Sequence, residues 1–157
     1  MAPPLLFDIS GVDLTRVIHD TAAIEAVNPH RGPMRLLDGI IYQSADKVDT
    51  LAYHDVRPDE FWVDGHIPGR PLMPGVLMVE TAAQLASFVT LTISPGIQFM
   101  GFVGIDDVKF RGQVVPGQRL LILCKAQKVT RRRSICATQG VVDDNLVFEA
   151  TITGMPI

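Results

Sequence analysis

The sequence has few of the residues that mark disulfide-rich, metal-binding or nucleic-acid-binding proteins. Its 157 residues include only two cysteines and four histidines. Cys124 and Cys136 lack metal-ligand spacing and lie in apolar, strand-like runs, so we expect buried, reduced thiols. The formal net charge of −3 argues against the strongly basic face of a general nucleic-acid binder.

The sequence also lacks repeats, linkers and long apolar runs. Its start has neither a basic n-region nor a sustained apolar core, and no run approaches the roughly 18 apolar residues of a membrane span. We therefore expect a soluble, cytoplasmic protein without a membrane span. With 47% hydrophobic residues, the chain can fill a core, and we predict a single domain over residues 1–157.

A cluster of prolines and glycines stands at the centre of the sequence. Three prolines and three glycines fall within residues 65–75, so this segment is predicted to be a fixed loop that presents His66. A mostly apolar helix is predicted from Val76 to Leu91, with Pro74 suited to its first turn. Gly75 lets a backbone N–H at the helix start come close to a ligand.

One polar stripe interrupts this apolar helix. Glu80, Gln84 and Ser87 are spaced at i, i+4 and i+7 and share one helix face. A carboxylate buried without a partner is costly and takes up a proton instead. Together with His66 and the helix N-terminus, Glu80 indicates an acid/base pair beside an oxyanion site. The alternative is a structural glutamate and a histidine that only orders the loop.

Most of the rest of the chain is predicted to form strands. Alternating or apolar runs predict strands on both sides of the helix, which is an α+β pattern with an antiparallel sheet wrapped around one long helix. A short amphipathic helix is expected near residues 14–24. His30 and Arg31 are expected to organise the backbone, and His54 to face solvent or a neighbour. The predicted strands cover residues 36–42, 47–54, 99–110, 119–129, 133–142 and 145–153.

Three stretches, in order, resemble the FabZ/FabA-type 3-hydroxyacyl-[acyl-carrier-protein] dehydratases. The central one is DGHIPGRPLMPGVLMVETAAQ, which is similar to the family run His-Phe-Pro-Gly-x-Pro-x-x-Pro-Gly-Val-Leu-x-x-Glu with a downstream Gln. NPHRGPMRLLD resembles the segment Pro-His-Arg-x-Pro-x-Leu-Leu-x-Asp. FVGIDDVKF, followed by VVPGQ, resembles a third family motif. The resemblance covers residues 24–155 and leaves residues 1–23 as an N-terminal extension.

The resemblance implies a hot-dog fold, an antiparallel sheet around a central helix, whose protomers pair edge to edge. It implies a homodimer, from which a trimer of dimers can assemble. It also implies that His66 of one chain and Glu80 of the other complete each site. No cofactor or metal is implied. Dehydration of a 3-hydroxyacyl thioester in fatty acid or related lipid biosynthesis is the expected activity.

Each site residue then has an expected role. His66 is the base for the C2 proton, Glu80 holds the proton for the departing hydroxyl, and the Gly75 N–H polarises the thioester carbonyl. Gln84 orients Glu80 or a water. The acyl tunnel is expected to be lined by Ile67, Pro68, Val76, Ala83, Ser87 and Met100.

Departures from the family pattern limit what carries over. Ile67 stands where the family has phenylalanine, so the resemblance does not fix the preferred length of the acyl chain. Met100 and Gly101 stand where many relatives have aromatic residues, so it does not imply a tyrosine gate to the tunnel either. Glu80, rather than aspartate, is typical of the FabZ branch.

The expected partner is an acyl carrier protein, which is acidic and would need a basic surface. The candidate residues are Arg70, Lys128, Arg131, Arg132 and Arg133; the alternative for the arginine run is a solvated turn. A hot-dog thioesterase and a non-catalytic acyl-binding subunit remain rival functions.

Overall fold

The computed structural model describes residues 1–157 and contains one curved sheet and one long helix. Two short helical segments precede the sheet. The elements, in chain order, are α1 (Thr21–Val27), the 3-10 turn η1 (Gly32–Met34), β1 (Gly39–Gln43), β2 (Asp49–Asp55), α2 (Gly75–Ile93), β3 (Met100–Phe110), β4 (Arg119–Val129), β5 (Ser134–Val142) and β6 (Asn145–Pro156).

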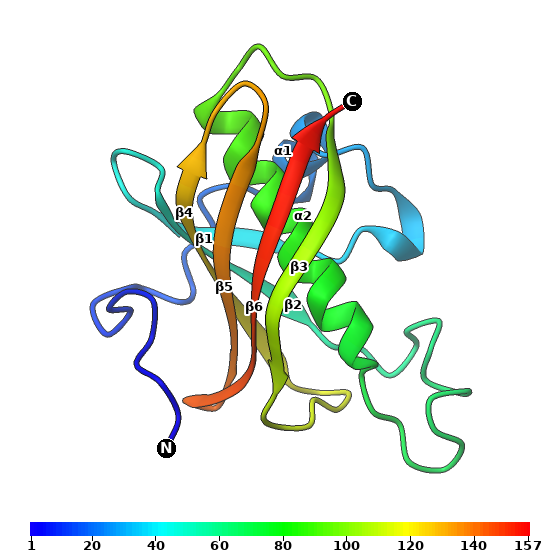
Figure 1. The fold of residues 1–157 in the computed structure, drawn as a ribbon. Coiled ribbons are helices and arrows are strands. Elements are labelled where there is room, and N and C mark those ends of the chain that lie inside the picture. Colours follow the sequence, from blue (N-terminus) through cyan, green and yellow to red (C-terminus); the bar gives the residue numbers. More distant parts are fainter.

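The six strands form a single sheet in the order β1-β2-β4-β5-β6-β3, and every neighbouring pair is antiparallel. Helix α2 runs diagonally across one face of this sheet (Figure 1). Short turns join β4 to β5 and β5 to β6, whereas residues 111–118 connect the edge strand β3 to the interior strand β4. The α+β class and the hot-dog arrangement expected from the sequence are therefore confirmed.

Helix α2 begins at Gly75, after Pro74, and ends before the Ser94-Pro95-Gly96 break. By length and composition alone it could cross a membrane, since an 18-residue window has a mean hydropathy of 1.6. It is not an unbroken apolar run, since Glu80, Gln84 and Ser87 interrupt it. Within the domain, 56% of that window is buried. Enclosure by the sheet explains why the helix is apolar on nearly all sides.

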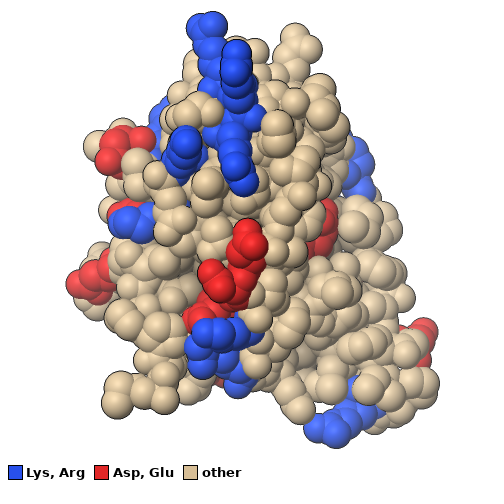
Figure 2. Space-filling view, viewed as in Figure 1, with Lys and Arg blue, Asp and Glu red and all other residues tan.

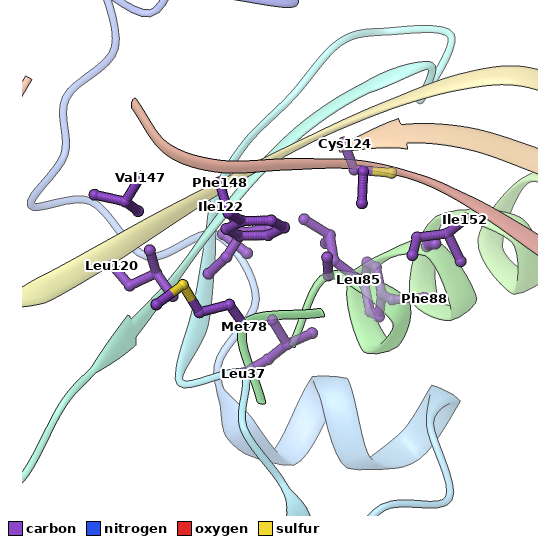
Figure 3. Close-up of a cluster of buried hydrophobic side chains, with 14 of the residues drawn as sticks. Leu37, Met78, Leu85, Phe88, Leu120, Ile122, Cys124, Val147, Phe148 and Ile152 are labelled. Carbon is purple, nitrogen blue, oxygen red and sulfur yellow. The ribbon is translucent and has the colours of Figure 1, made fainter. Parts of the chain in front are cut away.

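The core lies between α2 and the inner face of the sheet (Figure 3). Leu85 and Phe88 on the helix pack with Ile122 and Phe148 from the strands, and all four are at most 2% exposed. Cys124 and Cys136 are free and buried in the same cluster, as the sequence predicted. A hydrogen bond to Cys136 and burial raise the pKa of Cys124, which keeps it a neutral thiol.

The N-terminal segment differs from its prediction. Helix α1 spans Thr21–Val27 only, and Leu14, Val17 and Ile18 are partly exposed outside any helix. The reason is local capping. The Asp20 side chain accepts from the Ala23 N–H at 2.9 Å and starts the helix there. Residues before it run over the outer face of the sheet, where Leu6, Phe7, Ile9 and Val12 cover a second apolar cluster.

Strand β3 forms one edge of the sheet and pairs only with β6. Its apolar side chains are unusually open to solvent, with Phe102 at 49%, Val103 at 54% and Phe110 at 53% exposed. An edge strand with free N–H and C=O groups and exposed apolar side chains is a template for another strand. One edge of β3 is therefore open in the chain.

Candidate active site

The loop that carries His66 has no regular secondary structure but is anchored by buried side chains. It leaves the sheet after β2, lies beside the N-terminal end of α2 and is visible at the lower right of Figure 1. Trp62 and Met73 are 5% and 3% exposed and anchor its two ends. Phe61, which precedes Trp62, is 55% exposed and does not anchor the loop.

His66 is held by backbone groups at both its main chain and its ring. Its N–H donates to Trp62 O at 2.8 Å, and its C=O accepts from Leu72 N at 2.8 Å. Its Nδ1 lies 2.7 Å from Leu72 O. A carbonyl oxygen only accepts, so Nδ1 carries the hydrogen. The neutral ring therefore presents an unprotonated Nε2, which is the form a general base needs.

Glu80 and Gln84 interact as the helical spacing predicts. Gln84 Nε2 donates to Glu80 Oε1 at 2.9 Å and to Met34 O at 2.7 Å. Gln84 Oε1 accepts from Leu36 N at 3.0 Å, so both ends of the amide are bound. This amide is 2% exposed. Glu80 is thus fixed by a rigid neighbour through Oε1, while its side chain remains 26% exposed and accessible.

A second contact to Glu80 was not anticipated. His30 Nε2 lies 3.5 Å from Glu80 Oε1, so the Pro29-His30-Arg31 segment reaches the site. Arg31 does organise the backbone as expected, because its guanidinium donates to the carbonyls of Asn28, His30 and Glu25. The family-like motif around His30 was the only sequence signal. The spatial contact spans 50 residues and depends on the fold.

The start of α2 is open for a ligand. No side chain caps it, so the N–H groups of Gly75 and Val76 have no helical partner. The helix dipole adds partial positive charge at this end. A Cβ atom at Gly75 would lie 2.8 Å from the Phe110 ring, so glycine allows the close approach of β3.

The predicted tunnel residues fall into two groups. Ala83, Ser87 and Met100 line one small groove with Phe102 and Ile152, with a volume of about 30 Å³. Ile67 and Val76 are 49% and 73% exposed near the loop and do not line it. Pro68 is likewise exposed. The groove therefore accounts for half of the expected lining, and the other half faces outward from the chain.

Within the chain, His66 and Glu80 form neither a hydrogen bond nor an ion pair. Glu80 contacts only Gln84 and His30 through its carboxylate, and His66 contacts only backbone through its ring. One protomer by itself therefore does not assemble the acid/base pair.

The expected carrier-binding residues lie at two ends of the sheet. Lys128, Arg131, Arg132 and Arg133 are exposed around the β4–β5 turn, where Figure 2 shows basic side chains gathered at the top. Arg70 lies in the His66 loop, with Nη2 at 3.4 Å from Gln113 Oε1.

An antiparallel sheet around an apolar helix, with a loop histidine and a helical glutamate, defines a hot-dog domain built for acid/base chemistry. Residues 28–151 match the model of the FabA-like domain. The chain belongs to the FabA-like family. It is 40% identical over 142 residues to the 3-hydroxyacyl-[acyl-carrier-protein] dehydratase FabZ of Brucella abortus (strain S19), covering 87% of each chain.

A second FabZ dehydratase, from Lawsonia intracellularis, is 38% identical over 129 residues, covering 80% of this chain and 84% of its own. Solved structures share the fold at low identity. The dehydratase heterocomplex ApeI:P from Xenorhabdus doucetiae superposes with a TM-score of 0.72 at 14% identity, over 85% of this chain and 90% of that one. A hypothetical thioesterase from Streptococcus pneumoniae, with coenzyme A, gives 0.58 at 11% identity, over 75% and 84%. The fold is therefore shared by more than one chemistry.

Proposed function

We propose that this protein removes water from a 3-hydroxyacyl thioester carried by acyl carrier protein, giving the trans-2-enoyl product. One observation carries the proposal: a loop histidine with its Nε2 free and a helical glutamate held by Gln84 occupy the positions that the family motif assigns to base and acid. Kinship with FabZ dehydratases at 38–40% identity supports the same activity.

The chemistry follows from the two side chains. His66 Nε2 takes the C2 proton, and negative charge develops on the thioester oxygen. The N–H groups at the start of α2 face this charge and stabilise it. Glu80 gives its proton to the C3 hydroxyl as the C3–O bond breaks, and water leaves. His66 then loses its extra proton to solvent and Glu80 regains one, which restores the site.

The site is proposed to need two chains. His66 and Glu80 do not meet within the chain, and β3 offers an open apolar edge. An antiparallel pairing of two β3 edges would place the His66 end of one protomer beside the β4–β5 turn of the other, because these features lie at opposite ends of the sheet in Figure 1. Phe102, which borders the tunnel groove, would be covered in the same step.

This pairing also supports a single docking surface for the carrier protein. Arg70 from one protomer would lie near the basic turn of residues 131–133 from the other, so both candidate patches would face one acidic partner. Lys125, on the same strand as Lys128, is not included in this surface because it forms an ion pair with Asp49 at 2.9 Å.

A thioesterase is the second candidate, because the hypothetical thioesterase from Streptococcus pneumoniae shares the fold. Hydrolysis would use a carboxylate-activated water and would leave His66 without a role. The held glutamate and the free Nε2 of the histidine together favour dehydration.

The test compares the dehydration rates of wild type, His66→Ala and Glu80→Gln. The substrates are 3-hydroxyacyl carrier proteins whose acyl groups have several chain lengths. His66→Ala is expected to abolish both dehydration and exchange of the C2 proton with solvent. Glu80→Gln keeps volume and hydrogen-bonding reach, so a loss of about 10²–10⁴-fold is expected from general acid catalysis alone. Near-full turnover by Glu80→Gln, or rapid thiol release from a saturated acyl thioester, would overturn the proposal.

A further inference from the structure

The carboxyl group of Glu80 has one occupied and one free oxygen. Oε1 accepts from Gln84 Nε2 at 2.9 Å, and the ring of His30 lies against the same oxygen, with Nε2 at 3.5 Å. No hydrogen bond or ion pair within the chain reaches Oε2. Because the amide N–H already points at Oε1, the acid proton is best placed on Oε2. The proposed acid therefore depends on how its carboxyl group is oriented.

The ring of His30 is placed by its backbone and not by hydrogen bonds of its own. Its Nδ1 is buried and has no hydrogen-bond partner. The ring lies beside Glu80 Oε1 whichever nitrogen carries the hydrogen, so its effect on the carboxyl group is one of position. Residues that fix the backbone of His30 therefore also fix this side of Glu80.

Arg31 fixes that backbone by binding three carbonyl groups. Its Nη1 donates to Asn28 O and His30 O, and its Nη2 donates to Glu25 O, each at 2.8 Å. Glu25 O lies in the last turn of α1, where carbonyls lack a helical partner. A planar guanidinium carries several donors in a fixed fork, so one side chain can hold all three carbonyls. The end of α1 and the turn after it are thus held as one unit.

The same segment also binds Gln84, the residue that orients Glu80. Asn28 Nδ2 donates to Gln84 O at 2.8 Å, and Asn28 is 2% exposed. After Arg31 the chain turns through η1, where Met34 O accepts from Gln84 Nε2 at 2.7 Å. Arg31 therefore lies between the two points at which this segment is hydrogen-bonded to Gln84. Its own side chain is 56% exposed and does not contact Glu80.

We propose that Arg31 is a positioning residue for the acid. By holding the turn after α1, it keeps His30 and Gln84 beside Glu80 Oε1, so that Oε2 is left to carry the proton to the C3 hydroxyl. The inference rests on the proposed function. It assigns Arg31 to the acid and not to the base, because the hydrogen bonds of His66 are made with Trp62 and Leu72 in a separate loop.

The kinetic test compares Arg31→Ala and Arg31→Lys with wild type in the full-length protein. For Arg31→Ala, kcat is expected to fall about tenfold, because a misplaced acid loses part of its contribution. KM should stay unchanged, and so should the exchange of the C2 proton with solvent, which reports on His66. The compact ammonium of Arg31→Lys cannot span three carbonyls, so this variant should be intermediate. Arg16→Ala, at an exposed arginine on the N-terminal segment, is the control.

A purely structural role for Arg31 would give a different pattern. Dehydration and C2 proton exchange would then fall together, in proportion to the folded and assembled fraction measured by sedimentation. That result, or full kcat in Arg31→Ala, would overturn the inference. If Arg31→Ala does not fold, the ratio of exchange to dehydration in Arg31→Lys decides between the two roles.

A measurement without substrate separates this inference from the proposed function. The side-chain amide hydrogens of Gln84, assigned in nuclear magnetic resonance spectra with Gln84→Leu, report on the bonds to Glu80 and Met34. Arg31→Ala should shift these signals and speed their exchange with solvent, whereas Arg16→Ala should not. Unchanged signals in folded Arg31→Ala would contradict the inference. If wild type does not dehydrate 3-hydroxyacyl thioesters, the proposed function fails, but these signals still show whether Arg31 orients the Gln84 amide.

Discussion

At the residue scale, the site depends on one amide. Gln84 satisfies Met34 O, Leu36 N and Glu80 Oε1 while almost fully buried. Gln84→Leu keeps the volume but leaves these groups without a partner. We expect a loss of about 1–3 kcal/mol in the free energy of unfolding and a fall in kcat, because Glu80 loses its orientation. Denaturant titration and initial rates measure the two effects.

Ser87 is the matched control for this prediction, since it lies on the same helix face and its side chain forms no hydrogen bond. Ser87→Ala should leave the free energy of unfolding nearly unchanged. Equal effects of both substitutions would mean that the stripe acts only through packing.

A second residue-scale prediction concerns acid stability. Burial acts to raise the pKa of Asp38, but hydrogen bonds from His54 and the Asp55 N–H and the charge of Arg57 outweigh it, so the pKa is lowered. The ionised carboxylate therefore stabilises the fold above the unfolded pKa of about 4, and this contribution is lost as pH falls through the lower folded value. In Asp38→Asn the free energy of unfolding should therefore depend less steeply on pH below pH ~4.

The measurement is the free energy of unfolding from urea titrations between neutral and acidic pH. Asp59→Asn, an exposed carboxylate in the neighbouring segment, is the control and should keep the wild-type slope. An unchanged slope in Asp38→Asn would show that other carboxylates dominate acid unfolding.

The candidate residues themselves could be predicted from the sequence because their motif is local. His66, Gly75, Glu80 and Gln84 fall within 19 consecutive residues. Their partners could not be predicted, because the contacts of His30 with Glu80 and of His54 with Glu60 depend on how distant segments pack. A histidine between two acids has the same local sequence pattern as one facing solvent.

At the element scale, the sheet and helix followed from hydrophobic patterning, and the predicted strand bounds lie close to those observed. The prediction of the N-terminal helix was wrong because the spacing of apolar residues alone does not show where side chains cap a helix or close a turn. Asp13 accepts from Thr15 N at 3.0 Å and closes a turn at the start of the expected helix.

Close packing between strands gives an element-scale prediction. A Cβ atom at Gly140 on β5 would fall 2.4 Å or less from the ring of Phe148, which is 0% exposed and cannot move aside. Gly140→Ala should therefore lower the free energy of unfolding by about 1–3 kcal/mol through overpacking. Gly96→Ala has open space around it and should be near neutral. Equal melting temperatures for the two variants would show that β5 and β6 separate freely.

At the scale of the whole molecule, charge on the His66 loop is expected to steer the carrier protein. Arg70→Glu should raise KM about tenfold for a carrier-protein substrate at low salt and change little for a small thioester mimic, and salt should reduce the difference. Arg16→Glu, an exposed arginine on the N-terminal segment, is the control. Equal losses on both substrates would assign Arg70 to loop structure instead.

Assembly is the property that a single chain shows least directly, and the resemblance to a dimeric family was the only sequence signal for it. The open edge of β3 gives it a physical basis, since exposed apolar side chains and unpaired backbone groups occur together there. If two β3 edges pair, a charge on this edge should split the dimer and abolish turnover together, because neither protomer brings His66 to Glu80 alone.

Val103→Lys tests this pairing, because Val103 lies on β3 and is 54% exposed. Val17→Lys is its control, because Val17 is 44% exposed but lies on the N-terminal segment. Sedimentation is expected to show a dimer or a larger assembly for wild type and Val17→Lys, and a folded monomer for Val103→Lys. Dehydratase activity should follow the assembled fraction as protein concentration is varied. An active monomer at any concentration would mean that the loop histidine reaches the helical glutamate of its own chain, and the two-chain site would have to be abandoned.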